Sequence, residues 1–338
     1  MVSQKKVFVY PPYTGSDRNP GNLYLKLFEE SFSGYENLKL VRHDKFKTPF
    51  WNLLYYWRSD IFFFSWVEGL VYSFSGKMKF LLIALIILVA RWTNRDVIWI
   101  LHNKHPHKGK TWATTKAMRF LAKYSTVVVT HSQTGITYFN SEFEKNKEKC
   151  YFIPHPVYST EMIPPKTLKW DYIIWGEILP RKGILEFLRF ANSCDFFKTK
   201  KILVCGRCKN TDYSELLSKE CNNNVTFINE FIHDDVLREY VSSSRYILFP
   251  YQTSSVLSSG SLVYSLNYGK PIIGPNVGVF AEMDKIVTCY DSFEEIIDLH
   301  VTFDTNVLMN YIEQNNWNTF LSKVLDLLEN RKSSFRAK

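Results

Sequence analysis

The chain has 338 residues, of which 46% are hydrophobic and 22% are charged. It is long enough for two domains with separate cores, and this composition excludes an intrinsically disordered protein. The six cysteines are scattered, which fits a reducing compartment, and the pair Cys205 and Cys208 has no second pair at zinc-site spacing. The chain begins with a short strand pattern and not with a secretory signal, so we expect a cytoplasmic protein.

Positive charge is concentrated in the first half of the chain. Residues 1–168 carry 23 lysines and arginines against 12 acidic residues, a net charge of +11, whereas the remainder has 19 against 21, a net of −2. A basic half predicts a polyanionic partner. No helix-turn-helix, RNA-recognition or zinc-finger pattern is present, which argues against nucleic acid and favours an anionic membrane surface.

Short apolar runs alternate with helical patterns along this first half. The run at 60–65 is apolar on both faces, as buried parallel strands are. Residues 23–32 are apolar at helical spacing. The predicted strands lie at 5–10, 38–41, 60–65, 96–101 and 126–130.

The most apolar stretch of the chain is Met78–Trp92. Its uncharged centre, Phe80–Ala90, is much shorter than the roughly 20 residues that a membrane-spanning helix needs. We therefore expect a buried or interfacial helix. Together with the basic charge, the aromatic residues just before it predict docking to an anionic membrane. These aromatic residues are Phe62, Phe63, Phe64, Trp66, Tyr72 and Phe74.

The strand and helix alternation restarts after prolines at 154, 156, 164 and 165. A helix is predicted for 317–329. The repeated alternation predicts two parallel α/β sheets in separate domains. The strands predicted for the second half lie at 171–175, 201–205, 225–228 and 246–249, with another beginning at Pro271.

Histidines gather after the fourth predicted strand, where His102, Asn103, His105 and His107 follow one another closely. Histidine titrates near neutral pH, so one of these rings is a candidate to accept a proton from a substrate hydroxyl. The alternative is a capped loop whose histidines bond to the backbone, and the residues leave both open. Asp44, after the second strand, is a further candidate base.

The segment 249–278 reads FPYQTSSVLSSGSLVYSLNYGKPIIGPNVG. A strand ends at Phe249, a loop of serines and glycine follows, and a helix is predicted to end at Gly269. Such a strand, loop and helix N-terminus together form an anion site, because backbone N–H groups and hydroxyls meet the positive end of the helix dipole. An ordinary serine-rich turn is the alternative.

A second cationic segment, Arg181-Lys182-Gly183, lies between a predicted strand and a helix. Two cations at this point would bind a diphosphate leaving group and offset its charge as a bond breaks. A solvated charge pair is the alternative.

These segments resemble the donor-binding half of GT-B glycosyltransferases, in particular bacterial enzymes that build capsule and exopolysaccharide. The resemblance rests on Pro-Tyr, Ser-Ser-Gly-Ser, Gly-Lys-Pro and Pro-Asn-Val-Gly within 249–278, on the lysine-glycine pair at 182–183, and on His-Asn…Pro-His at 102–107. It implies an α/β protein of two Rossmann-like parallel-sheet domains facing across a cleft. The implied divisions are an acceptor-binding domain at 1–160, a donor-binding domain at 169–310, and a C-terminal helix at 311–338 that packs back toward the first domain.

The resemblance also implies roles for single residues. The implied catalytic candidates are His102 and His107, and Asp44 stays a candidate base from its position after the second predicted strand. The implied acceptor-binding residues are Tyr13, Asn19 and Asn103. The implied donor-binding residues are Gly176, Arg181, Lys182, Arg207, Phe231, Ile232, Tyr251, Ser258, Ser259, Gly260, Ser261 and Glu282. No metal or other cofactor is implied, because the nucleotide diphosphate sugar serves as co-substrate.

The sequence departs from the family pattern at three positions. Two glutamates common in retaining members are replaced by Val256 and Tyr264, and an arginine that often follows the first glycine is replaced by Glu177. Retention or inversion of the sugar configuration therefore stays open.

We expect a glycosyltransferase, of the hexosyltransferase class, that moves a sugar from a UDP- or GDP-linked donor to a lipid-linked or growing glycan acceptor in surface polysaccharide synthesis. Such an enzyme would act in the cytoplasm, peripherally associated with the inner face of the cell membrane. The alternatives are a nucleotide-sugar epimerase of the same fold and a non-catalytic sugar- or membrane-binding module. A nicotinamide-dependent dehydrogenase is disfavoured, because no Gly-x-Gly-x-x-Gly motif follows the first strand.

Overall fold

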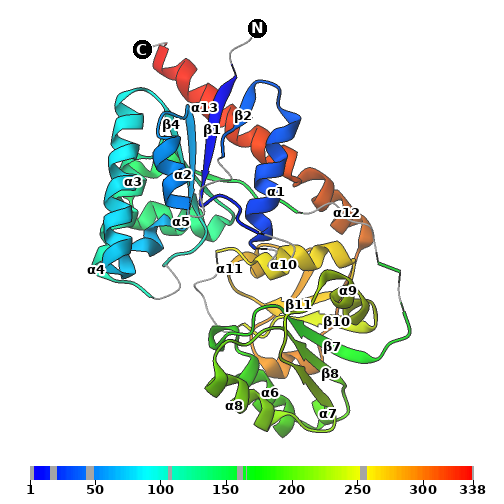
Figure 1. The fold of residues 1–338 in the computed structure, drawn as a ribbon. Coiled ribbons are helices and arrows are strands. Elements are labelled where there is room, and N and C mark those ends of the chain that lie inside the picture. Colours follow the sequence, from blue (N-terminus) through cyan, green and yellow to red (C-terminus); the bar gives the residue numbers. More distant parts are fainter. Residues whose placement is uncertain are drawn as a thin grey trace. The chain divides into compact units, whose positions relative to one another are not determined.

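The computed structural model describes residues 4–15, 21–42, 49–105, 109–157, 163–164, 166–251 and 257–336. The chain divides into two compact units (Figure 1). The first comprises Met1–Pro156 and Trp317–Lys338, and the second comprises Val157–Asn316. Each unit holds one six-stranded parallel sheet. The predicted fold class, two Rossmann-like parallel α/β sheets, is confirmed.

The sheet of the first unit has the strand order β2-β1-β3-β4-β5-β6, and every neighbouring pair is parallel. A parallel sheet needs helical crossovers, which cover both of its faces and make its central strands apolar throughout. The strands are β1 (Lys5–Tyr10), β2 (Leu38–Leu40), β3 (Ile61–Ser65), β4 (Asp96–Leu101), β5 (Val127–Thr130) and β6 (Cys150–Phe152).

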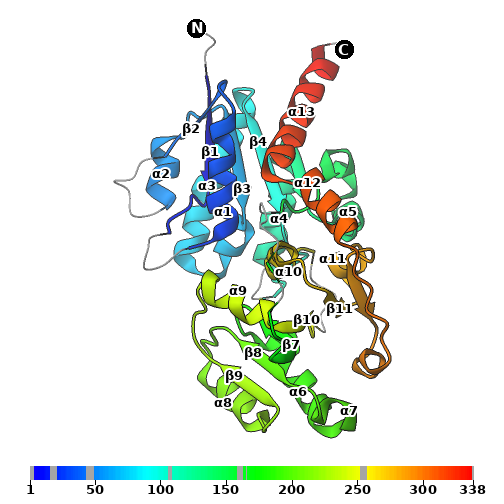
Figure 2. The same cartoon turned by 90° about the vertical axis from the view of Figure 1, so that its right-hand side faces the viewer.

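Two helices from opposite ends of the chain cover one face of this sheet. Phe28 of the first helix and Trp317 of the last approach with ring centroids 5.8 Å apart, and both lie in the core against the strands (Figures 1 and 2). The last helix is therefore part of the first unit. The helices of this unit are α1 (Leu23–Ser31), α2 (Pro49–Tyr55), α3 (Phe74–Trp92), α4 (Trp112–Tyr124), α5 (Gln133–Glu142) and α13 (Trp317–Arg336).

The sequence linked two features to membrane docking, the aromatic residues at positions 62–74 and the apolar stretch Met78–Trp92. Phe62, Phe63 and Phe64 of β3 are fully buried, so their predicted contribution to docking is wrong. They lie in an inner parallel strand, where both faces are covered. The apolar stretch forms α3, and no helix in the described ranges is long and apolar enough to cross a membrane.

The sheet of the second unit has the order β12-β11-β10-β7-β8-β9, again with parallel pairs only. The strand order reverses direction at β7, as in doubly wound α/β proteins. The strands are β7 (Trp170–Trp175), β8 (Ile202–Cys205), β9 (Val225–Ile228), β10 (Ser244–Leu248), β11 (Ile272–Pro275) and β12 (Val287–Tyr290).

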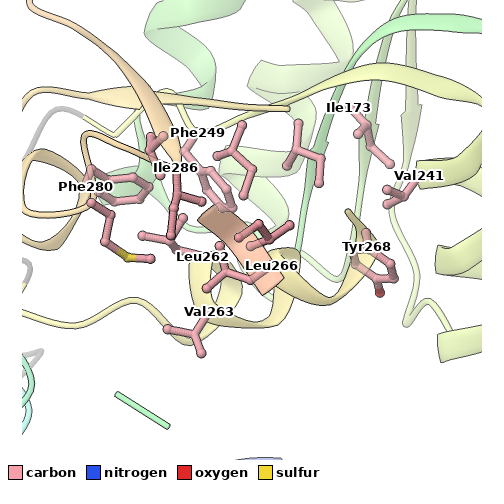
Figure 3. Close-up of a cluster of buried hydrophobic side chains, with 14 of the residues drawn as sticks. Ile173, Val241, Phe249, Leu262, Val263, Leu266, Tyr268, Phe280 and Ile286 are labelled. Carbon is pink, nitrogen blue, oxygen red and sulfur yellow. The ribbon is translucent and has the colours of Figure 1, made fainter. Parts of the chain in front are cut away.

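The segment that follows β10 is built around one buried cluster. Leu262, Val263 and Leu266 of the serine-rich segment pack with Phe249 and Phe280 (Figure 3). The helix continues as a short 3-10 turn and ends at Gly269, as the glycine predicted, with a left-handed φ of 58°. The helices of this unit are α6 (Ile184–Ser193), α7 (Asp195–Lys198), α8 (Thr211–Glu220), α9 (Asp234–Ser242), α10 (Gly260–Ser265), α11 (Gly278–Ala281) and α12 (Thr305–Gln314).

Candidate functional site

The candidate donor-binding residues lie in the segments that follow the strands of the second sheet, most of them in loops and Gly260 and Ser261 at the start of α10. Gly176 follows β7, Arg207 follows β8, Phe231 follows β9 and Tyr251 follows β10. Because the strands are parallel, their carboxyl ends share one edge of the sheet. Ligands of open α/β sheets bind at this edge, outside the carboxyl ends of the strands.

Three residues from separate segments converge at this edge. A Cβ atom placed on Gly176 would lie 3.0 Å from Ser261 Oγ and 3.2 Å from Lys182 Nζ. Gly176 also has φ +106°, a conformation that side chains disfavour. The glycine therefore keeps open a small space that a hydroxyl and an amine both border, which suits an oxygen atom of an anionic ligand.

Lys182 lies in a 3-10 turn, Pro180–Lys182, and only 5% of it is exposed. Its Nζ atom lies 5.6 Å from the centroid of the Tyr251 ring. No carboxylate among the described residues forms an ion pair with this lysine. A buried cation costs free energy unless an anion compensates it, so an anionic ligand bound here would stabilise Lys182.

The floor of this space is formed by two backbone loops in close contact. A Cβ atom on Gly206 would lie 1.9 Å from the carbonyl oxygen of Gly176, so only glycine fits there. The Gly176 N–H donates to the Cys205 carbonyl at 3.2 Å, and the Ile178 N–H donates to the Arg207 carbonyl at 3.0 Å. These bonds hold the loop that leads to Lys182 against the end of β8.

The serine-rich loop contributes in distinct ways. Ser259 caps α10, because its Oγ accepts the N–H of Leu262 at 3.2 Å. Ser261 directs its hydroxyl toward Gly176 and Lys182. Gly260 is exposed, and a Cβ atom there would meet nothing within 4 Å. Ser258 is half-buried.

The other donor-binding candidates lie on the same edge. Arg181 and Arg207 are exposed. Phe231 is 51% exposed, with its ring edge-on to His233 at 5.1 Å. Ile232 is partly buried against the core of the second unit. Glu282 is exposed and lies near Tyr311 of α12, whose pKa is raised to about 12 by burial and, to a smaller extent, by the charge of Glu282.

In the first unit, three buried histidines surround Tyr24 of α1. The ring of Tyr24 lies 5.0 Å from His102, 5.9 Å from His131 and 5.1 Å from His155, measured between centroids. His102 and His131 directly follow β4 and β5, and His155 lies a short distance after β6. The cluster therefore occupies the carboxyl edge of the first sheet.

The hydrogen bonds of this cluster fix two of the histidine tautomers. His131 Nδ1 lies 3.0 Å from the Ile153 carbonyl and so carries the proton, which leaves Nε2 to accept from the Tyr24 hydroxyl at 3.3 Å. His155 Nδ1 donates to the Pro156 carbonyl at 3.0 Å. Burial lowers the pKa of His131 to about 3 and the pKa of His155 to about 4, so both rings are neutral at neutral pH.

His102 is held by an aromatic stack. Its ring lies 4.3 Å from that of Trp66, almost parallel to it, and its Nε2 lies 3.4 Å from Ser65 Oγ. Trp66 has a left-handed φ of 56°, a strain of roughly 1–3 kcal/mol that the surrounding contacts must offset. Such strain is typical of functional sites. His102 itself is only 4% exposed.

The remaining candidates of the first unit are placed in part. The Tyr13 N–H donates to Glu29 Oε1 at 2.6 Å, and Asn103 is half-buried. Three candidates, Asp44, His107 and Asn19, lie outside the described residues. Within the described ranges, no group of three His, Cys, Asp or Glu side chains is arranged to hold a metal ion.

Sequence reasoning selected His102 but passed over His131, His155 and Tyr24 as site residues. The histidines lie far apart in the chain, and only the parallel sheet brings them together. The sequence signal for these histidines is their position shortly after an apolar run, because the carboxyl ends of parallel strands are where ligands bind.

The chain is similar to several solved glycosyltransferase structures. HepE of Anabaena in complex with UDP is 14% identical, with 99% of this chain and 100% of that chain covered at a TM-score of 0.60. The lipopolysaccharide outer core galactosyltransferase WaaB is 11% identical, with 97% and 100% covered at 0.62. A glycosyltransferase from Rickettsia africae is 11% identical, with 98% and 99% covered at 0.62. No family model and no curated protein sequence matches the chain.

At these identities the comparisons establish the fold. The matches extend over nearly the whole of this chain and of the three neighbours. The neighbours are GT-B glycosyltransferases, so the GT-B fold implied by the sequence motifs is confirmed.

Proposed function

We propose that the chain is a glycosyltransferase that uses a nucleotide diphosphate sugar as donor. The observation that carries this proposal is Lys182, a buried cation without a carboxylate partner among the described residues, directed at the space above Gly176. A diphosphate supplies the negative charge that this arrangement lacks. Similar folds hold UDP in HepE and UDP-glucose in a second HepE complex.

The chemistry follows from the charge that develops as the glycosidic bond breaks. The leaving nucleoside diphosphate gains negative charge, and the amine of Lys182 and the hydroxyl of Ser261 offset it. The Gly176 and Gly206 backbone contacts hold the loop that leads to Lys182, and Ser261 lies in the first turn of α10, which Ser259 caps, so little reorganisation is needed. The acceptor hydroxyl must lose its proton, and His102, His107 and Asp44 remain the proposed bases.

The finer proposals concern the substrates. We propose a UDP- or GDP-linked hexose as donor and a lipid-linked or growing glycan as acceptor, in surface polysaccharide synthesis. HepE with UDP-glucose and the galactosyltransferase WaaB support a hexosyl donor. The acceptor would be presented at the inner face of the cell membrane, and the basic charge of the first unit supports that location.

A thermal-shift series tests the donor site. UDP, GDP, UDP-glucose and UDP-galactose are compared with UMP and with free glucose, since a ligand of the folded state raises its stability. We expect one nucleoside diphosphate to stabilise the protein more than UMP does, because Lys182 contacts phosphate. If no nucleoside diphosphate stabilises the chain, the donor assignment is wrong and a non-catalytic module is favoured.

A second experiment separates transfer from epimerisation. The donor that gives the largest thermal shift is incubated alone and with membrane extract as a source of acceptor. Release of nucleoside diphosphate only with the extract supports transfer. Conversion of the donor to its epimer in the absence of acceptor would identify an epimerase of the same fold.

A further inference from the structure

The outer face of α3 carries an unbroken apolar stripe. Its six side chains are spaced alternately four and three residues apart and are 40–85% exposed. They are Phe74, Met78, Leu81, Leu85, Leu88 and Trp92. At 1.5 Å per residue the stripe is about 27 Å long. The opposite side of α3 is buried within the first unit. A contiguous apolar surface rimmed by polar groups marks an interaction site.

A basic stripe with the same spacing runs along α4. It is formed by Trp112, Lys116, Arg119 and Lys123, all exposed. The two helices are in contact, with the rings of Phe80 and Phe120 6.1 Å apart (Figure 1). On α4, Lys116 Nζ lies 3.7 Å from the centroid of the exposed Trp112 ring. Apolar and cationic side chains therefore lie next to each other on the surface of α3 and α4.

Exposed acidic side chains are missing from these two helices and their connections. From residue 61 to residue 141 the sequence has ten lysines and arginines but only two acidic residues, Glu68 and Asp96. Glu68 is 2% exposed and Asp96 is 4% exposed, so neither contributes to the surface. The first unit as a whole has 27 lysines and arginines against 13 acidic residues, a net charge of +14.

We propose that α3 lies flat in the surface of an anionic bilayer, with its apolar stripe at the boundary between headgroups and acyl chains. Helices docked in this way bury their apolar face by roughly 5–10 Å. The exposed cations of α4, and Lys77 near the start of α3, then lie at the level of the lipid phosphates. Each cation near an anionic surface contributes about 1 kcal/mol at low salt.

Charge decides between this partner and a second copy of the chain. Pairing of two α3 stripes would bring together two basic stripes and two units of net charge +14, which repel each other. An anionic bilayer supplies both the apolar phase and the opposite charge. The proposal depends on the surface of α3 and α4 alone, so it stands whether or not the second unit binds a nucleotide sugar.

Flotation of the purified full chain tests this proposal with vesicles of phosphatidylcholine, alone or mixed with phosphatidylglycerol. We expect binding to the mixed vesicles at low salt, with most of it lost at high salt. Leu81→Glu and Leu85→Glu each place a charge in the apolar stripe and should reduce bound protein by roughly tenfold or more. The matched control is Leu216→Glu, which changes an exposed leucine of α8 in the second unit and should bind as wild type does.

A charge variant probes the other half of the mechanism. Lys116→Gln combined with Arg119→Gln should weaken binding to the mixed vesicles, and the loss should shrink at high salt. Far-ultraviolet circular dichroism and the thermal shift with nucleoside diphosphate report the fold and the second unit in each variant. Unchanged donor binding in Leu81→Glu separates this proposal from the proposed enzymatic function.

Three outcomes would overturn the proposal. The first is absence of the chain from the floated phosphatidylglycerol vesicles at low salt, and the second is flotation of Leu81→Glu and Leu85→Glu at the wild-type level. The third is a dimer in light scattering that Leu81→Glu dissociates, which would make the stripe an interface between copies.

Discussion

Replacing Lys182 by methionine tests the donor site and its energetics together. Methionine keeps most of the length of the side chain and its packing against Tyr251 but removes the cation. Loss of a charge-assisted contact to phosphate costs about 1.5–3 kcal/mol. At 1.4 kcal/mol for each factor of ten, the dissociation constant of the nucleoside diphosphate should rise about 10- to 150-fold.

The same replacement should not destabilise the free protein. Lys182 is 5% exposed and forms no ion pair with a described carboxylate, so its burial opposes folding. We expect the free energy of unfolding of the ligand-free variant to equal that of wild type or to exceed it by about 1 kcal/mol. A lysine with a purely structural role predicts the opposite result, a less stable protein with normal donor affinity.

Isothermal titration with the best nucleoside diphosphate and urea unfolding without ligand measure the two quantities. Lys219→Met is the matched control, because Lys219 is exposed on α8 and should change neither. A dissociation constant of Lys182→Met within twofold of wild type would refute the assignment of this lysine to the donor phosphate.

The other predictions concern Gly260 and three buried ionisable groups. Gly260→Ala adds a methyl group where the free protein has open space, so its stability should equal that of wild type in thermal unfolding. If phosphate lies over this residue, the affinity for nucleoside diphosphate, measured by titration, should fall on the order of tenfold. The pKa of His155 is lowered to about 4 in the folded protein and is near 6.5 in the unfolded chain, so the unfolded chain binds more protons below about pH 6.5. Wild type should therefore lose more stability between pH 7 and pH 5 than His155→Gln does. Urea unfolding at both pH values measures this difference. His131, with its pKa lowered to about 3, acts in the same direction, and His131→Gln should reduce the loss in the same way. The stability contributed by Glu68 changes with pH in the opposite direction. Burial raises the pKa of Glu68 to about 7 from 4.5, so the stability it contributes is lost as the pH rises through 7. Glu68→Gln should therefore be more stable than wild type at pH 8 but not at pH 5.

Hydrophobic periodicity predicted the helices and strands, because each strand is an apolar run bounded by polar, proline or glycine residues. The run at 60–65 forms β3, the run at 96–101 forms β4, and the glycine at 269 ends the helix of the serine-rich segment. The parallel arrangement also followed, because strands apolar on both faces need helices on both sides. The secondary-structure elements and the parallel α/β class were therefore predictable from local patterns, whereas the strand order was not.

Periodicity could not assign the direction of single side chains in short loops. Arg181 and Lys182 are neighbours in sequence, yet only the lysine is buried above Gly176, because the 3-10 turn directs adjacent residues to different sides. Ser259 and Ser261 differ in the same way, one capping a helix and the other facing the lysine. Such differences depend on turn geometry, to which residue type contributes little.

The sequence also could not predict which residues far apart in the chain lie close together in the fold. His131 and His155 meet His102 around Tyr24 only because β4, β5 and β6 are neighbours in the sheet. The strand order of a parallel sheet is not written in the spacing of its strands. The sequence therefore did not predict that three histidines lie together at one edge of the sheet. One of them is in a histidine-rich loop, and the other two are isolated in the sequence.

Two of the features described above depart from the usual rules of protein structure, and each departure indicates which chemical group would compensate it. Lys182 is a buried cation that lacks a carboxylate partner in the described ranges, and the missing group is an anion. The outer side of α3 is an exposed apolar stripe beside cations, and the missing group is an anionic surface with an apolar phase behind it. Natural proteins keep such inconsistencies where function requires them. A phosphate-bearing molecule would satisfy both: the proposed nucleotide sugar in the second unit and the proposed anionic lipid at the first. A lipid-linked acceptor would then reach the enzyme by diffusion in the membrane surface, which predicts that Leu81→Glu impairs transfer to a membrane-bound acceptor while a water-soluble acceptor analogue is glycosylated at the wild-type rate.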